Sequence, residues 1–266
     1  MVQTASRPAI SEQRDGYVFR SNLPFELGPG VGQRAKIGMI VLDTDGTMEF
    51  ETGRILARDG VAVYGTRIPM GTTVTLETLR AMEPAITAAA REILPDEDLD
   101  VIAYCCTSGT AAIGKERIFA LIHAGRPAVA CTTPIVAGVA AARALGIRRL
   151  AVLTPYVEEV SLSIRDFIRR EGIDVPVLAT FNTADDREVR RISAASLREA
   201  ILEAGRGDVE AVFVSCTSLY VTPAIAECEA ALGKPVLASN QAMAWHCLRL
   251  AGVNDRVAGF GRLLTV

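Results

Sequence analysis

Two cysteines of the chain occur in nearly the same sequence context, 110 residues apart. Cys106 ends the apolar run in DVIAYCCTSGTAAI and Cys216 ends the one in VEAVFVSCTSLYVTPAI; Thr-Ser and a predicted helix follow each. The start of a helix presents unpaired N–H groups and a partial positive charge, which stabilise a thiolate or a carboxylate. The hydroxyl groups beside the two thiols belong to Thr107, Ser108, Thr217 and Ser218.

Two thiols that face one small carboxylate can catalyse isomerisation without a cofactor. One thiolate removes a proton from, or adds to, a carbon beside the carboxylate, while the other thiol delivers a proton to the opposite face. The result is racemisation, epimerisation or cis–trans isomerisation. No cofactor is expected, and the sequence has no GxGxxG, Walker A or HExxH motif. A Thr-Ser pair after a strand is also an ordinary helix cap, so it is the two equivalent copies together that favour catalysis.

Alternating strand and helix patterns position both motifs. From Lys36 onward, short β-branched runs alternate with helical spacing, which predicts an α/β fold of mostly parallel sheets flanked by helices. Four such units in each half predict two pseudo-symmetric lobes, each with a four-stranded sheet. Single helices are expected over 76–94, 109–125 and 187–205. Ligands bind beyond the carboxyl ends of parallel strands, so the active site is expected in the cleft between the lobes.

The predicted division of the chain starts with a segment unlike the rest. Residues 1–35 mix Ser, Arg, Gln, Gly and Pro and are expected to form an arm that covers the body or a partner subunit. An N-terminal lobe is predicted over 36–131 and a C-terminal lobe over 132–239. The final segment, 240–266, is expected to pack back on the first lobe. The arm also favours a homo-oligomer.

Composition excludes several classes of function. The 266 residues carry a net charge of −3 and no long basic run, so no nucleic-acid partner is expected. No apolar run approaches the length of a membrane span, and the N-terminus does not resemble a secretory signal. None of the six cysteines has zinc-site spacing. We therefore expect a cytoplasmic protein with reduced thiols, no metal and no membrane partner.

The motifs resemble those of the aspartate/glutamate racemase superfamily over about residues 36–266. AYCCTSGTAA and VFVSCTSL are similar to its two cysteine motifs. VLDTDGTMEFE, CTTPIVAGVAAARALGIRRLAVLTPY and PVLASNQAMAWHCLRLAG resemble the maleate cis–trans isomerase and arylmalonate decarboxylase branch, which also includes the ectoine-utilisation EutA proteins. The resemblance implies a small carboxylate substrate and a homo-oligomer. It implies that Cys106 is the nucleophile or first base and Cys216 the acid/base. Substrate contacts are implied for Thr107, Ser108, Tyr156, Thr217 and Ser218.

Departures from the family pattern bear on the substrate and the reaction. The decarboxylases have glycine in place of Cys106, so decarboxylation is disfavoured. Maleate isomerases have asparagine where this chain has Asp45, and a second asparagine near Asp186. A carboxylate suits a substrate with an ammonium or amide group, although Asp45 could also simply cap the next helix. Glutamate racemases have histidine in place of Ser218. Asn240, at the start of the last long helix, is either a cap or a ligand contact.

Four hypotheses remain open at this point. The first is a two-cysteine isomerase resembling maleate cis–trans isomerase. The second is a racemase or epimerase of an amino acid or derivative, for example in ectoine breakdown. The third is an arylmalonate-type decarboxylase that uses only Cys216. The fourth is a non-catalytic module that binds a small molecule.

Overall fold

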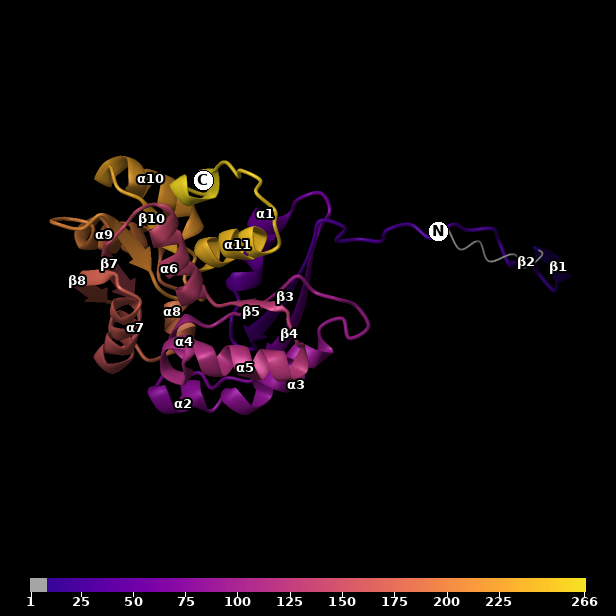
Figure 1. Cartoon of the computed structure of the whole chain (residues 1–266), viewed down its shortest axis with the longest axis horizontal. Helices are drawn as coiled ribbons and strands as arrows, with labels where there is room; N and C mark the ends of the chain where they lie inside the picture. The colour runs from indigo at the N-terminus through magenta and orange to yellow at the C-terminus, as the bar shows by residue number, and fades with distance from the viewer. Residues whose placement is uncertain (1–8) are drawn as a thin grey trace.

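Two four-stranded parallel sheets, each flanked by helices, form the body of the computed structural model, which describes residues 9–266 (Figure 1). The strands are β1 (Ile10–Arg14), β2 (Tyr17–Ser21), β3 (Ala35–Leu42), β4 (Val61–Ile68), β5 (Val101–Tyr104), β6 (Ala130–Thr132), β7 (Arg149–Thr154), β8 (Asp174–Thr180), β9 (Ala211–Val214) and β10 (Val236–Ala238). The helices are α1 (Met48–Leu56), α2 (Leu76–Arg80), α3 (Ile86–Glu92), α4 (Thr107–Ile113), α5 (Lys115–Gly125), α6 (Pro134–Ala144), α7 (Glu158–Arg170), α8 (Asp186–Val189), α9 (Ala194–Ala204), α10 (Thr222–Leu232) and α11 (Ser239–Leu250). Short 3-10 helices cover Glu83–Ala85 and Arg262–Thr265.

The two sheets have the same topology. The first has the order β4-β3-β5-β6 and the second β10-β9-β7-β8. Numbered within its own lobe, each sheet follows the order 2-1-3-4, and all of its pairings are parallel. The predicted fold class, α/β with two four-stranded parallel sheets, is therefore confirmed.

The central strands of both sheets lie in the hydrophobic core. Every residue of β5 and of β9 is buried, because helices cover both faces of each sheet. Close helix packing depends on small residues. A Cβ atom at Gly138 would lie 2.7 Å from the ring of Phe213, so this glycine lets α6 approach β9.

The three long helices predicted from the sequence are each interrupted, and those predictions were wrong. Pro84 divides the first into α2, a 3-10 turn and α3, because proline lacks an N–H group and its ring clashes with the preceding turn. Gly114, with φ of +99°, divides the second into α4 and α5. In the third, Ser193 caps the N-terminus of α9 and separates it from α8.

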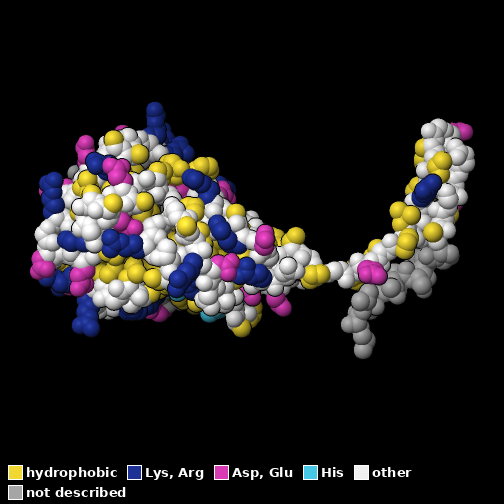
Figure 2. Space-filling model, turned by 90° about the horizontal axis from the view of Figure 1, so that it is seen from above, with side chains coloured by type: hydrophobic (Ala, Val, Ile, Leu, Met, Phe, Trp, Pro, Cys, Tyr) yellow, Lys and Arg dark blue, Asp and Glu magenta, His cyan; other side chains and the backbone are white. Residues whose placement is uncertain are grey.

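The described part of the N-terminal arm contains a hairpin that the sequence analysis did not predict. Strands β1 and β2 pair antiparallel and lie away from the body, so within one chain the arm does not cover it (Figure 1). Its side chains include exposed hydrophobic groups, which Figure 2 shows along the arm. The prediction falls partly on residues 1–8, which lie outside the described residues. Homo-oligomerisation stays a prediction. The exposed hydrophobic residues are Ile10, Tyr17, Val18, Phe19, Leu23, Phe25, Leu27 and Val31.

The last long helix joins the two lobes. Helix α11 contacts α1, β5 and β6 of the first lobe and also α6 and β10. The predicted domain boundaries at 35, 131 and 239 stay predictions. Among residues 9–266, no helix is long and apolar enough to cross a membrane.

Candidate active site

The sheet topology places the site residues at equivalent edges of the two lobes. In each lobe the first and third strands are neighbours whose connections leave in opposite directions, the arrangement that opens a ligand crevice at the carboxyl ends. In the first lobe Asp45 follows β3 and Cys106 follows β5. In the second, Tyr156 follows β7 and Cys216 follows β9.

Cys106 occupies the N-cap position of α4. Its Sγ atom accepts a hydrogen bond from the N–H of Gly109 at 3.2 Å and lies 3.7 Å from the Oγ of Ser108. A Cβ at position 109 would lie 3.0 Å from this sulfur and 2.6 Å from the hydroxyl of Tyr104, so the close approach requires glycine. Burial raises the pKa of the Cys106 thiol to about 11, although the bonds from Gly109 and Ser108 oppose this shift.

Cys216 has a different backbone setting. The expectation that this motif, like the first, opens onto a helix N-terminus was wrong, because the predicted helix that follows, α10, begins only at Thr222. The sulfur instead accepts a hydrogen bond from the N–H of Ser218 at 3.3 Å within a turn. Burial raises the pKa of this thiol, and so does the nearby charge of Asp186; hydrogen bonds from Tyr156 and Ser218 oppose the rise.

Tyr156 connects the two lobes at the thiols. Its hydroxyl group interacts with Cys216 and with Ser108, the residue beside Cys106, and both act on its pKa. Only 4% of the residue is exposed. Burial is the main cause that raises its pKa well above the ordinary value, and the two thiols contribute to this rise. Tyr156 therefore lies close to a cysteine of each lobe.

Asp45 uses its two carboxylate oxygens differently. Oδ1 accepts hydrogen bonds from the N–H groups of Thr47 at 2.8 Å and Met48 at 2.9 Å, which caps α1. Oδ2 is buried and has no hydrogen-bond partner. The charge of Asp45 raises the pKa of both Cys106 and Cys216. The capping role is therefore present, and one oxygen remains available beside the thiols.

Asp186 also lies in this cluster, as the sequence comparison with maleate isomerases suggested only loosely. Its Oδ1 accepts a hydrogen bond from the Oγ of Ser218 at 3.1 Å. Burial raises its pKa, and the charge of Asp45 adds to the rise. A bridge between Thr73 and Asp185 holds its segment against the first lobe.

The other predicted contact residues are engaged in hydrogen bonds that anchor α11. Thr107 lies 3.0 Å from Ser239 between their hydroxyl oxygens. The Nδ2 of Asn240 donates to the backbone carbonyl of Thr217 at 2.8 Å and to the carboxylate of Glu51 at 2.7 Å, while its Oδ1 has no partner. The Thr217 side chain is buried with them. Asn240 therefore positions the second cysteine motif.

Sequence reasoning missed Glu51, a buried carboxylate on α1. It accepts hydrogen bonds from the N–H of Thr222 at 2.7 Å and from the hydroxyl of the same residue, so it caps α10 in the other lobe. Burial raises its pKa. Its position in VLDTDGTMEFE, one helical turn from the Asp45 cap, carried no signal of a contact between the lobes.

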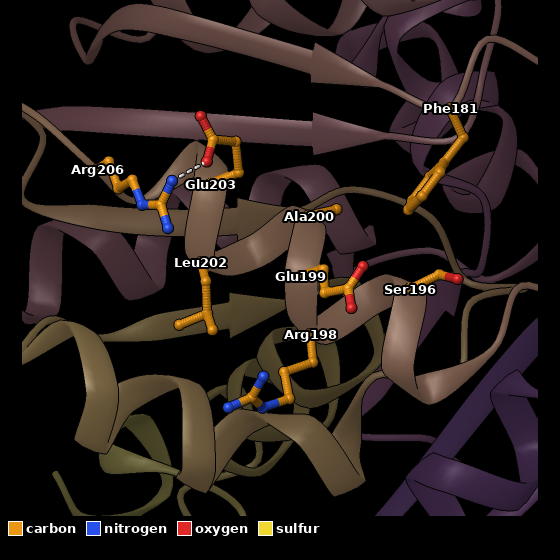
Figure 3. A pocket seen from close by; sticks show the side chains of 8 residues that line it. All are labelled: Phe181, Ser196, Arg198, Glu199, Ala200, Leu202, Glu203 and Arg206. Carbon is orange, nitrogen blue, oxygen red and sulfur yellow. Dashed lines mark hydrogen bonds and ion pairs between the residues drawn. The ribbon is translucent and has the colours of Figure 1, made fainter.

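The cluster is closed in this structure. Cys106 and Cys216 are each 2% exposed. A surface hollow of about 660 Å³ lies elsewhere, over α9, and none of the predicted site residues lines it (Figure 3). Its charged side chains include the ion pair between Arg206 and Glu203. In the part of the chain that the structure describes, no group of three His, Cys, Asp or Glu side chains could hold a metal ion.

A family profile and individual relatives both match this chain over most of its length. The sequence profile of the family described as "Arylmalonate decarboxylase" matches residues 37–264. The maleate isomerase of Alcaligenes faecalis is 26% identical over 245 residues, which cover 86% of this chain and 96% of that protein. The arylmalonate decarboxylase of Bordetella bronchiseptica is 29% identical over 232 residues, which cover 85% and 95%.

Solved structures extend the comparison to the fold. The maleate isomerase Iso from Pseudomonas putida S16 superposes with a TM-score of 0.79 at 29% identity, covering 87% of this chain and 98% of that one. A cysteine-to-serine mutant of the Nocardia farcinica maleate cis–trans isomerase, solved with a covalently bound succinylcysteine intermediate, also has a TM-score of 0.79, at 26% identity and with the same coverage.

Proposed function

Since the chain belongs to the arylmalonate decarboxylase and maleate isomerase family of the aspartate/glutamate racemase superfamily, we propose that it is a cofactor-independent cis–trans isomerase of a small unsaturated carboxylate. The observation that carries this proposal is the position of Tyr156. Its hydroxyl contacts Cys216 of one lobe and Ser108 beside Cys106 of the other. One substrate between the lobes would therefore meet a thiol from each.

The first half of the reaction forms a covalent adduct. The thiolate of Cys106 adds to one carbon of the double bond, and the π-electron pair moves to the neighbouring carbon. That carbon takes the proton of the Cys216 thiol, leaving Cys216 as a thiolate. The succinylcysteine in the Nocardia farcinica enzyme supports an intermediate of this kind.

The second half reverses these bonds after rotation. The two substrate carbons are now joined by a single bond, about which the substrate turns. The Cys216 thiolate removes the proton, the double bond forms again, and Cys106 leaves as the thiolate. Atoms and charges return to their starting places, so no metal, flavin or other cofactor is consumed.

The surroundings of each thiol support these roles. The N–H of Gly109 and the hydroxyl of Ser108 lie beside Cys106 and stabilise its thiolate against burial. At Cys216 the charge of Asp186 adds to burial. Both raise the pKa of this thiol and so favour its protonated form. A protonated Cys216 is the form that can donate. We further propose that Ser108, Thr107, Thr217 and Ser218 orient the substrate carboxylate, and that the protein works in the cytoplasm, where thiols stay reduced.

Three other functions predict different outcomes in one experiment. Proton NMR in heavy water would follow the enzyme with maleate, a panel of amino acids, diaminobutyrate derivatives and an arylmalonate. Interconversion of an unsaturated acid is expected. Racemisation with exchange of an α-proton would instead indicate a racemase, and loss of carbon dioxide would indicate a decarboxylase. Thermal stabilisation without any turnover would indicate a binding module.

Cysteine variants test the same proposal. Cys106→Ser and Cys216→Ser should each reduce turnover by about 10³-fold or more, because each step needs both thiols. The matched control is Cys131→Ser, whose sulfur contacts His123 and the carbonyl of Val129 outside the cluster. Full activity in either active-site variant would contradict the proposal.

A further inference from the structure

We propose, building on the isomerase function above, that the site selects a carboxylic acid that also bears a positively charged nitrogen, which Asp45 and Asp186 bind together. These two side chains lie in the same buried cluster as the two cysteines, one from each lobe. A substrate with carboxylates alone would leave both of them without a cationic partner.

The first observation is the free oxygen of Asp45. Two backbone N–H groups fix its Oδ1 atom, so the orientation of the whole carboxylate is determined by α1. Its Oδ2 atom is then left buried without a hydrogen-bond partner, in a residue that is 2% exposed. A buried carboxylate oxygen without a partner loses its interaction with water and gains nothing in return. A bound donor group would remove that cost.

The second observation is the matching carboxylate on the opposite lobe. Asp186 is 6% exposed, and its Oδ1 accepts one hydrogen bond from Ser218, which also binds the Cys216 sulfur through its N–H group. The charge of Asp45 acts on Asp186 and raises its pKa. Both also act on each cysteine. The two carboxylates therefore flank the thiols together.

The third observation is that no cation in residues 9–266 pairs directly with either carboxylate, although the charge of Arg190 acts to lower the pKa of Asp186. Within residues 9–266 neither carboxylate forms an ion pair with a lysine, arginine or histidine. Arg67 donates to the backbone carbonyl of Asp45 at 3.1 Å, and its guanidinium pairs with Glu49. Arg190, an exposed residue, donates to the carbonyl of Thr44 at 3.4 Å.

These features define the charge of the ligand. Two like charges in a buried site repel a further carboxylate placed between them, and they attract an ammonium group. The substrate carboxylate then belongs at hydroxyl groups that contact neither aspartate, such as that of Ser108. The ligand class is a small acid with an ammonium group within a few bonds of the reacting carbons.

Calorimetric binding with paired probes tests this inference. Each aminated acid is compared with its counterpart lacking any ammonium group: aspartate with succinate, glutamate with glutarate, and 2-aminoadipate with adipate. At least one aminated probe is expected to bind about tenfold or more tightly than its counterpart. Tighter binding of every counterpart, or no binding of any aminated probe, would overturn the proposal.

Conservative variants identify the residues responsible. In Asp45→Asn and Asp186→Asn the amide oxygen can still accept the existing hydrogen bonds, so α1 keeps its cap. The double variant should lose the preference for the aminated probe. The matched control is Asp43→Asn, which removes the same charge from an exposed residue whose side chain accepts from the N–H of Met70. An unchanged preference in the double variant would overturn the proposal.

The two proposals can fail separately. Binding is measured without turnover, so an amine preference would stand even if Cys106→Ser and Cys216→Ser left the activity intact. Conversely, the enzyme could convert maleate between its cis and trans forms and yet bind succinate more tightly than aspartate, and each other amine-free acid more tightly than its aminated partner. That result would support the isomerase and contradict the amine preference.

Discussion

The two cysteine motifs share the letters Cys-Thr-Ser but differ in what surrounds the sulfur. Cys106 begins helix α4 and receives the N–H of Gly109, three residues on. Cys216 lies two residues after the end of β9, at the start of a bend, where it receives the N–H of Ser218, two residues on. Equivalent positions in repeated lobes therefore have different electrostatic surroundings, which supports the different roles proposed for the two thiols.

A proline explains the difference. If a helix began directly after Cys216, Pro223 would fall in its second turn, where proline removes a hydrogen bond and clashes with the backbone. The helix instead begins at Thr222, which places Pro223 in its first turn, a position that proline tolerates. The corresponding stretch after Cys106 has no proline before α4 ends at Ile113. One residue type thus decides which cysteine lies at a helix N-terminus.

The largest expected effect distinguishes the two thiols by which cysteine variant accumulates a covalent intermediate. In Cys216→Ser the adduct at Cys106 can still form slowly, with its proton taken from water in place of Cys216, and its return is slowed by about 10³-fold because the acid/base is lost. Intact-protein mass spectrometry should show the added mass of the substrate. Cys106→Ser should show no adduct. An adduct in Cys106→Ser that is absent in Cys216→Ser would reverse the assigned roles.

A smaller effect concerns pH. Burial raises the pKa of the Cys106 thiol to about 11, so its reactive thiolate is the minor form at neutral pH. The thiolate fraction grows by about tenfold for each unit of pH below that pKa. The kcat/KM should therefore rise with pH from 7 to 9, while Cys216 remains protonated because its own pKa is also raised. A falling limb within this range would contradict the assignment.

The smallest expected effect tests Tyr156, whose hydroxyl lies near both cysteine motifs in space. Tyr156→Phe removes the hydroxyl that contacts Cys216 and Ser108 and keeps the packing of the ring. Loss of this polar interaction should reduce kcat by about tenfold. Steady-state kinetics and thermal unfolding measure the two consequences separately. A change in unfolding temperature without a change in kcat would assign Tyr156 to packing alone.

Much of the fold was predictable because it follows from local patterns. Alternating β-branched runs and helical spacing predicted the two parallel sheets, and the repeated Cys-Thr-Ser predicted their equivalence. The interruptions in the three long helices were harder to predict from the sequence. Pro84 is a visible signal for a break, whereas the divisions at Gly114 and Ser193 depend on how the flanking helices pack.

The sequence by itself determined that two cysteines end equivalent strands of two similar lobes, because strand and helix periodicity and the motif repeat are properties of neighbouring residues. Only the tertiary structure decided which groups join them. Asp186 lies 30 residues before Cys216 in the chain, and it reaches the cluster because its segment pairs with Thr73 of the other lobe. Asn240, in turn, faces Glu51. Contacts between lobes depend on how two sheets are placed against each other, which no local pattern encodes.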